Sequence, residues 1–295
     1  MTFKNVLCPV DFSENTENIA RLAVKLSEDG AKIVLFNHSV LISPVLGPEA
    51  AISFEADREL RDLAKMQLDK LAAKLKLQYP DRQFTTYHSY FKNITDEIND
   101  VVTAEHIDLI VMGTQGKDSK SDLFLGSNAY RLVTKAPMPV MTIKNLVNKK
   151  GYQNILLPID LSDHSRQKVN YALSMAKAFN AKITILGLYD ENEKGDKFKL
   201  EIVVNQIAKL CEKQKITFEQ YIDKTHHRVS KTNSFAKKHK NDLVITMTDQ
   251  KIEGFRGILS SYDHELIHTS KIPVISIEPE INSDISTGGT PGLPF

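Results

Sequence analysis

Short apolar runs alternate along this chain with longer segments in which apolar residues recur at helical spacing. Residues 6–10 form an apolar run typical of a buried strand, and behind it Leu22, Ala23 and Leu26 fall on one face of a helix. The same alternation continues toward the end of the chain. Buried strands that alternate with helices form a parallel sheet covered on both faces, so the pattern predicts a doubly wound, Rossmann-like α/β fold.

Local signals predict the limits of the elements. We expect Ser13 to cap the first helix and Gly30 to end it. Strands are expected over residues 33–36, 84–87, 109–112 and 140–143, and a helix over 94–102. The long helix between the second and third strands is expected to present an apolar face made of Leu60, Leu63, Ala64, Leu71 and Leu75.

The chain contains two related halves. The segment that begins at Asn5 resembles the segment that begins at Asn154 without a gap, at an offset of 149 residues, and the closing segments match at an offset of 134. These matches indicate a tandem duplication in which the second copy is shorter in its middle. We therefore divide the chain into a first domain over residues 1–147, a second over 148–281, and a Gly- and Pro-rich tail over 282–295 that is expected to lack regular structure.

Charge and composition narrow the class of partner. The 295 residues include 38 Lys and Arg and 37 Asp and Glu, so no long-range field attracts nucleic acid or an anionic membrane. No run approaches the roughly eighteen apolar residues of a membrane-spanning helix. Cys8 and Cys211 have no metal-ligand spacing and are expected in the core, as in a reducing compartment. We expect a cytoplasmic protein with a small ligand, and neither nucleic acid nor membrane as partner.

A glycine-containing stretch, residues 112–132, offers a binding site for that ligand. Gly113, Gly116 and Gly126 lie between an apolar run and a helix, and Ser127 follows the last glycine. Glycines let backbone amides approach oxygen atoms closely and adopt positive φ, and a helix start adds free N–H groups. Ligands of doubly wound sheets bind beyond the carboxyl ends of strands. The stretch therefore predicts a phosphate site, although a flexible surface loop would have a similar composition.

Several motifs resemble the universal stress protein family. They are LCPVDFSE, VMGTQGK and FLGSNAYRLV followed by PMPVMTIK, and the resemblance runs over nearly the whole of both copies. Members of that family that bind ATP carry the pattern Gly-x2-Gly-x9-Gly-Ser/Thr, which residues 113–127 reproduce without a gap. The resemblance implies an ATP-binding protein of stress response or signalling, with ATP, alone or with Mg2+, as its ligand.

The resemblance also implies roles for individual residues. Asp11 would contact the ribose, Pro9, Val10 and Ser39 would border the adenine, and the glycine-containing segments would wrap the phosphates. Lys117 and Lys120 either neutralise phosphate charge or belong to a solvated loop. The expected ATP-binding residues are Pro9, Val10, Asp11, Ser39, Met112, Gly113, Gly116, Lys117, Gly126, Ser127 and Asn128.

The second copy lacks the glycines of this pattern. Met247, Gln250 and Ser260 stand at the three glycine positions, whereas Asp160 keeps the aspartate. Side chains at these positions would crowd a triphosphate. We therefore expect one ATP per chain, held by the first domain, and a degenerate second domain.

Family members pair through their last strands, which implies a particular arrangement of the two copies. Here VMTIK and VISIE close the copies, so the resemblance implies an intramolecular pseudo-dimer in which residues 140–143 and 274–277 run antiparallel. A homodimer of whole chains is not excluded by this arrangement.

Two hypotheses in which the chain is a catalyst stay open. HELIH, residues 264–268, matches a zinc-protease pattern, but the repeat alignment puts Leu266 and Ile267 on the core face between the two histidines, so we expect no metal site. The glycine stretch has no Walker Lys-Ser pair, and its carboxylates are Asp118 and Asp122, so we expect slow ATP hydrolysis at most. A scaffold that ignores nucleotide and acts through protein partners is the other alternative.

Overall fold

The computed structural model describes residues 3–39, 50–90, 93–114, 127–144, 152–162, 165–190, 195–248 and 261–278. In the first domain the elements are β1 (Phe3–Pro9), α1 (Thr16–Leu26), β2 (Ser27–His38), α2 (Ala50–Gln78), β3 (Gln83–Ser89), α3 (Ile94–Ala104), β4 (Leu109–Gly113), α4 (Ser127–Lys135) and β5 (Val140–Ile143). In the second they are β6 (Asn154–Ile159), α5 (Lys168–Phe179), β7 (Lys182–Tyr189), α6 (Asp196–Lys213), β8 (Phe218–Lys224), α7 (Arg228–Lys238), β9 (Leu243–Met247), α8 (Ser261–Thr269) and β10 (Val274–Ile277).

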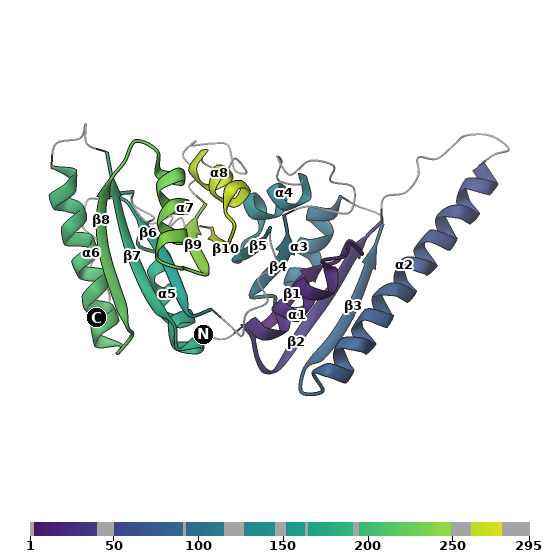
Figure 1. Ribbon diagram of the computed structural model, residues 1–295. Coiled ribbons are helices and arrows are strands. Elements are labelled where there is room, and N and C mark those ends of the chain that lie inside the picture. The colour runs from purple at the N-terminus through teal and green to yellow at the C-terminus, as the bar shows by residue number, and fades with distance from the viewer. Residues whose placement is uncertain are drawn as a thin grey trace, which may run out of the picture.

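The strands of both domains form one sheet (Figure 1). Their order is β3-β2-β1-β4-β5-β10-β9-β6-β7-β8. Within each domain neighbouring strands are parallel, whereas β5 and β10 are antiparallel at the centre, where Met141 lies opposite Ile275. The expected pairing of the two last strands is therefore confirmed, and it relates the domains by a pseudo-two-fold axis.

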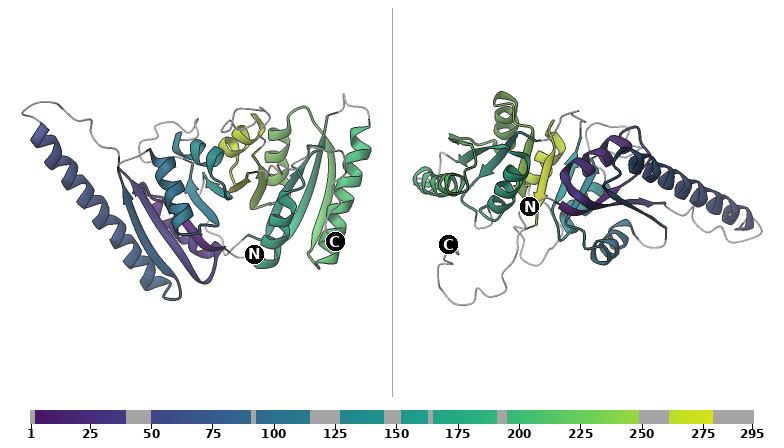
Figure 2. Two further views of the ribbon diagram at one scale, coloured as in Figure 1. Left: turned by 180° about the vertical axis from the view of Figure 1, so that it is seen from behind. Right: turned by 90° about the horizontal axis from the view of Figure 1, so that it is seen from below.

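Helices cover both faces of the sheet, as a doubly wound fold requires (Figures 1 and 2). One core cluster joins α1, α2, α5 and α6 to one face, and a second joins α3, α4, α7 and α8 to the other. Cys8 and Cys211 are buried in the first cluster, and burial raises the pKa of Cys8 to about 12 with help from the nearby charge of Asp11. None of the described helices combines the length and the apolar character needed to cross a membrane.

The first helix begins and ends at residues other than those expected. Asn15, not Ser13, is the N-cap of α1, and the Ser13 carbonyl accepts the N–H of Thr16 in the preceding turn. The helix ends at Leu26, and Gly30 lies within β2, where φ is 80°. The chain turns at this earlier point because Ser27 already pairs with β1. Gly30 thus lies in the part of β2 where the pairing register with β1 shifts.

The register of the two domains departs from the gapless alignment by one residue. Asn5 on β1 pairs with Lys32, and Asn154 on β6 pairs with Lys182. The offset between the copies is therefore 149 residues in the first strand and 150 in the second. The second copy therefore has one more residue than the first between these two strands; in that stretch α5 ends at Phe179 and is followed by Asn180 in the left-handed conformation.

The apolar face of α2 is shorter than expected. Ala64, Leu68 and Leu75 are buried, but the side chains of Leu60 and Leu63 are 51% and 45% exposed. Figure 1 shows that the amino-terminal end of α2 extends past the carboxyl end of β3. The tail expected over residues 282–295 lies outside the described residues. The boundaries of the two domains, 1–147 and 148–281, stay predictions.

Candidate functional site

The candidate site lies where the order of the strands reverses. β1 pairs with β2 on one side and with β4 on the other, and Leu7 lies opposite Ile110. This parallel register brings Asp11, which follows β1, to the same edge of the sheet as Gly113, the last residue of β4. Such a reversal leaves a crevice at the carboxyl ends of the two strands, where α/β proteins bind ligands.

Asp11 has a fixed but exposed carboxylate at this edge. Its Oδ1 accepts hydrogen bonds from the Ser13 N–H at 3.0 Å and from the Thr16 hydroxyl at 2.8 Å. The intervening Phe12 has φ 57°, a left-handed conformation that bulky residues rarely adopt. The turn therefore holds Asp11 by one oxygen of its carboxylate, in a strained backbone of a kind that is often found at functional sites.

The expected adenine border is tied together by a buried amide. The Asn37 Nδ2 donates to the Val10 carbonyl at 2.7 Å, and the Val10 N–H donates to the carbonyl of Phe36 at 2.7 Å. The hydroxyl of Ser39 lies 3.5 Å from Asn37 Oδ1 and 2.9 Å from His88 Nε2. Val10 and Ser39 are thus close in the fold, as expected, next to a half-buried Pro9.

The sequence analysis missed Asn37, although a signal was present. Asn37 is a polar residue at the end of the apolar run of β2, and its side chain is buried. A buried amide without partners costs free energy, so its presence in such a run indicates a specific hydrogen-bond acceptor. That acceptor is the backbone at Val10.

The carboxyl end of β4 carries a buried hydroxyl that has no partner in the described part of the chain. Met112 is buried, and Gly113 pairs with Ile143 in the sheet and does not adopt positive φ. Thr114 follows; its N–H donates to the Ile143 carbonyl at 3.0 Å, but its hydroxyl has no hydrogen-bond partner among the described residues. Thr114 was not expected in the site, because a single Thr beside a glycine has no distinctive pattern.

The remaining expected residues are described in part or not at all. Ser127 is the first residue of α4, so the helix starts where the sequence predicts, and Asn128 follows it. Gly116, Lys117, Lys120 and Gly126 lie outside the described residues.

In the second domain the equivalent aspartate is bonded through both oxygens. The Oδ1 of Asp160 accepts from the N–H and the hydroxyl of Ser162, and Arg228 donates to its Oδ2 at 2.9 Å. Burial acts to raise the pKa of Asp160, but the Ser162 hydrogen bonds and the charges of Lys168 and Arg228 outweigh it and lower the pKa. In the first domain Ile94 begins the helix that corresponds to α7, so a cation is missing at that position.

Side chains also fill the carboxyl end of β9. Met247, at the position of Gly113, is buried in the core. The hydroxyl of Thr248, at the position of Thr114, donates to the Ile277 carbonyl at 3.2 Å. Tyr262, at the position of Asn128, bonds to Thr232 at 3.1 Å, and burial raises its pKa. Thr248 is thus bonded internally, whereas the Thr114 hydroxyl at the equivalent position has no partner among the described residues.

The two histidines of HELIH flank the core as expected. Leu266 and Ile267 are buried between them, and His264 is exposed, with its ring 5.6 Å from that of Tyr130. Burial lowers the pKa of His268, with further contributions from Lys144 and His264. The described residues hold no group of three or more His, Cys, Asp or Glu side chains placed to bind a metal ion.

Comparisons with known proteins agree with this architecture. The model of the universal stress protein family matches residues 2–144 and 151–277. A universal stress protein of Methanocaldococcus jannaschii is 27% identical over 143 residues, which are 48% of this chain and 82% of that relative. The match thus covers about half of this chain and most of that relative.

Among solved structures, a universal stress protein from Archaeoglobus fulgidus covers 95% of this chain and 97% of its own, at 16% identity and a TM-score of 0.70. Another universal stress protein, solved in complex with cAMP, covers 43% of this chain and 98% of its own, at 20% identity and a TM-score of 0.38. The first likeness shows that a fold of this kind extends over nearly the whole chain.

Proposed function

Because this chain belongs to the universal stress protein family, we propose that its first domain binds ATP at the carboxyl ends of β1 and β4 and that its second domain does not. The glycine pattern over residues 113–127, which resembles that of ATP-binding members of the family, supports this assignment. The topology supports it too, because ligands of doubly wound sheets bind where the strand order reverses.

The observation that carries the proposal is a difference in hydrogen bonding between the polar groups at the equivalent sheet edges of the two domains. Asp11 is exposed and bonded through Oδ1, and the buried Thr114 hydroxyl has no partner among the described residues. Asp160 and Thr248 are bonded internally. Buried polar groups are normally satisfied, so an orphaned hydroxyl at one edge indicates that a ligand or water completes it.

Within that site each group has a distinct role. The Asp11 carboxylate accepts a hydrogen bond from a ribose hydroxyl, as acidic residues do in dinucleotide folds. Pro9, Val10 and Ser39 border the adenine; the Val10 N–H is already bonded to Phe36, so Val10 acts through its side chain. The phosphates lie against the backbone of Met112, Gly113, Gly116, Gly126, Ser127 and Asn128, with Lys117 and a phosphate-bound Mg2+ offsetting their charge.

The chemistry favours binding over turnover. Phosphoryl transfer requires a cation placed on the transferred group and a residue that orients the nucleophile. The segment 113–127 lacks the Walker Lys-Ser pair. We therefore propose a cytoplasmic stress-response or signalling protein in which bound ATP changes which partners are recognised, and hydrolysis is slow at most.

Mass spectrometry of the small molecules released from the natively purified full chain tests this proposal. We expect an adenine nucleotide, with ATP in excess over ADP. A chain that releases no nucleotide and binds none when ATP is added would instead be a scaffold that acts through protein partners. A chain that carries ADP and converts added ATP would be a hydrolase.

A further inference from the structure

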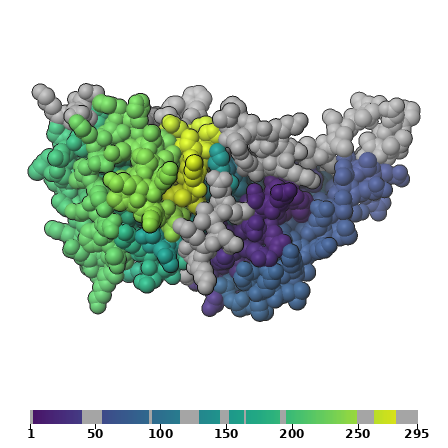
Figure 3. Space-filling model, in the orientation of Figure 1, coloured from purple at the N-terminus to yellow at the C-terminus, as the bar shows by residue number. Residues whose placement is uncertain are grey.

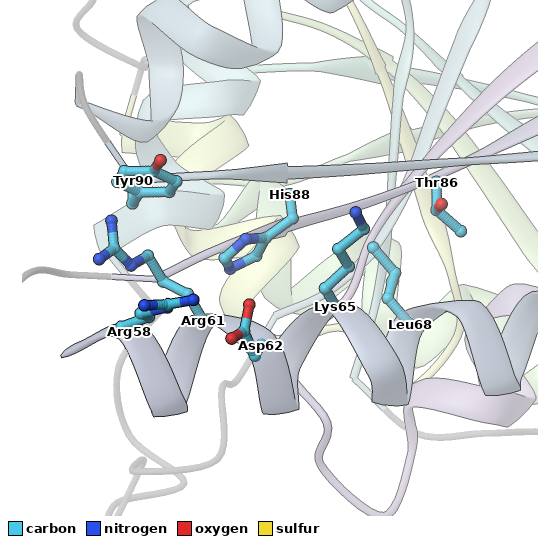
Figure 4. Close-up of a pocket in the computed structure, with 8 residues that line it drawn as sticks. All are labelled: Arg58, Arg61, Asp62, Lys65, Leu68, Thr86, His88 and Tyr90. Atoms are coloured by element: carbon cyan, nitrogen blue, oxygen red, sulfur yellow. The ribbon is translucent and has the colours of Figure 1, made fainter. Parts of the chain in front are cut away.

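A cavity of about 490 Å³ lies between α2 and β3 in the first domain, apart from the carboxyl ends of β1 and β4 (Figure 4). From β3 and the residue beyond it, Thr86, His88 and Tyr90 face the cavity at every second position, as one face of a strand does. The volume is in the range of roughly 300–1,000 Å³ that is typical of small-molecule sites.

The wall formed by α2 is strongly basic. Arg58, Arg61 and Lys65 line the cavity at spacings of three and four residues, so they share one face of the helix. Further along α2, the same face bears the buried Leu68. The side of the helix that turns to the sheet thus changes from apolar to cationic where it passes the end of β3.

Within the part of the chain that the structure describes, these three cations form no ion pair with a carboxylate. Among the ion pairs of the described residues, none involves Arg58, Arg61 or Lys65, and Asp62 is the carboxylate in the lining. Three cations against one carboxylate leave this wall of the cavity with a net positive charge, which favours an anionic ligand.

Arg61 and His88 are held in position at the cavity. The Arg61 Nε donates to the Asp57 carbonyl at 3.1 Å, and its guanidinium lies 4.5 Å from the centre of the Tyr90 ring. His88 Nε2 lies 2.9 Å from the Ser39 hydroxyl. Burial lowers the pKa of His88; the charges of His38, Arg61 and Lys65 act in the same direction, and that of Glu97 opposes them.

The second domain closes the equivalent space. Gly187 stands on β7 where Asn37 stands on β2, and a Cβ there would come within 3.1 Å of Leu200 and Val204, so α6 packs directly on the sheet. In the first domain the larger Asn37 occupies that position and bonds to Val10. α2 also has 29 residues against 18 in α6, and its extra length supplies part of the basic wall.

We propose that this cavity is a second ligand site of the first domain, which binds the phosphate group of a small organic molecule. Arginine forks match phosphate oxygens in pairs, and Arg58, Arg61 and Lys65 supply the positive charge. Leu68 and the Tyr90 ring supply apolar surface for the organic part, which free inorganic phosphate would leave uncovered. The site is separate from the proposed nucleotide site and adjoins it through the contact between His88 and Ser39.

Calorimetric titration of the full chain with ribose 5-phosphate tests the site, with inorganic phosphate titrated in parallel. The Arg61→Ala/Lys65→Ala variant should bind ribose 5-phosphate at least about tenfold more weakly than the wild type, because it removes two of the cations that pair with the phosphate. Lys70→Ala is the matched control, since it removes an exposed cation of α2 that does not line the cavity. Equal binding by the double variant and the wild type, or no binding by the wild type, would overturn the proposal.

A second comparison separates this site from the nucleotide site. Gly126→Val should leave ribose 5-phosphate binding intact, and the His88 imidazole resonances should shift on binding whereas those of the exposed His226 and His227 do not. Loss of binding in Gly126→Val with retention in Arg61→Ala/Lys65→Ala would place the phosphate in the glycine stretch and refute a second site. Equally tight binding of inorganic phosphate would refute an organic ligand.

Discussion

In the first domain the Asp11 carboxylate is exposed and bonded through Oδ1, whereas in the second the Asp160 carboxylate is bonded through both oxygens, to Ser162 and Arg228. The two domains have the same order of strands and meet at one central seam. The difference shows that a few side chains bond the polar groups of this edge internally in the second domain and leave the proposed ligand site open in the first, without any change of fold.

Gly126→Val should have the largest effect on nucleotide binding. A branched side chain there would stand in the proposed path of the phosphates, and overpacking of this kind costs about 1–3 kcal/mol, up to roughly a hundredfold in affinity. Isothermal titration with ATP measures the loss. Ser260→Val, the same change at the equivalent position of the second domain, is the control and should leave ATP binding unchanged. An unaltered affinity in Gly126→Val would remove the phosphates from this stretch.

Ile94→Arg should transfer the closed state to the first domain. Arg228 pairs with Asp160 from the equivalent helix position, so an arginine at residue 94 should compete with the ribose for Asp11. We expect about a tenfold loss of ATP affinity, the value of one charged hydrogen bond. Ile94→Leu keeps the size and apolar character and should bind ATP as the parent does. If the arginine variant also binds normally, Asp11 does not contact the ligand.

Thr114→Val and Thr248→Val should have opposite consequences. The Thr248 hydroxyl bonds to Ile277, so its loss should lower the free energy of unfolding by about 1 kcal/mol, as measured by urea denaturation. The Thr114 hydroxyl has no partner among the described residues, so Thr114→Val should leave stability unchanged and instead weaken ATP binding. A similar loss of stability in both variants would mean that Thr114 is bonded within the protein.

Asp160 should contribute a small pH dependence to stability. Its pKa is lowered in the folded state, so its contribution is fully present above the ordinary aspartate pKa and is lost as the pH falls through the folded value. In Arg228→Ile this loss between neutral pH and about pH 3 should shrink by about 1 kcal/mol or less, since the pair is partly exposed. Urea denaturation at the two pH values measures it; identical pH dependence in both proteins would contradict the role of Arg228.

The parts that sequence predicted well are those specified by local pattern. The alternation of apolar runs and helical faces located the strands, because a buried strand needs an uninterrupted apolar run whatever its neighbours are. Asp11 and Gly113 lie at strand ends, and the parallel register brings them to the same edge of the sheet as that position predicted; their role in binding stays a prediction. The antiparallel seam of β5 and β10 followed from the family resemblance and is confirmed.

The parts that were missed depend on contacts between distant segments. Arg228 reaches Asp160 across 68 residues, and no local pattern marks that pair. Leu60 and Leu63 have helical spacing, but periodicity does not reveal where a helix passes the edge of its sheet. The same limit hid the basic wall of the α2 cavity, because three cations on a helix resemble a solvated face until β3 is placed opposite them.

The number of ATP molecules bound per chain is the most direct test of whether the first domain alone binds ATP. Isothermal titration of the nucleotide-free full chain should give one site, and the Gly126→Val variant should lose it while Ser260→Val keeps it. Two equivalent sites per chain, or one site that is lost in Ser260→Val and retained in Gly126→Val, would contradict the assignment of ATP to the first domain.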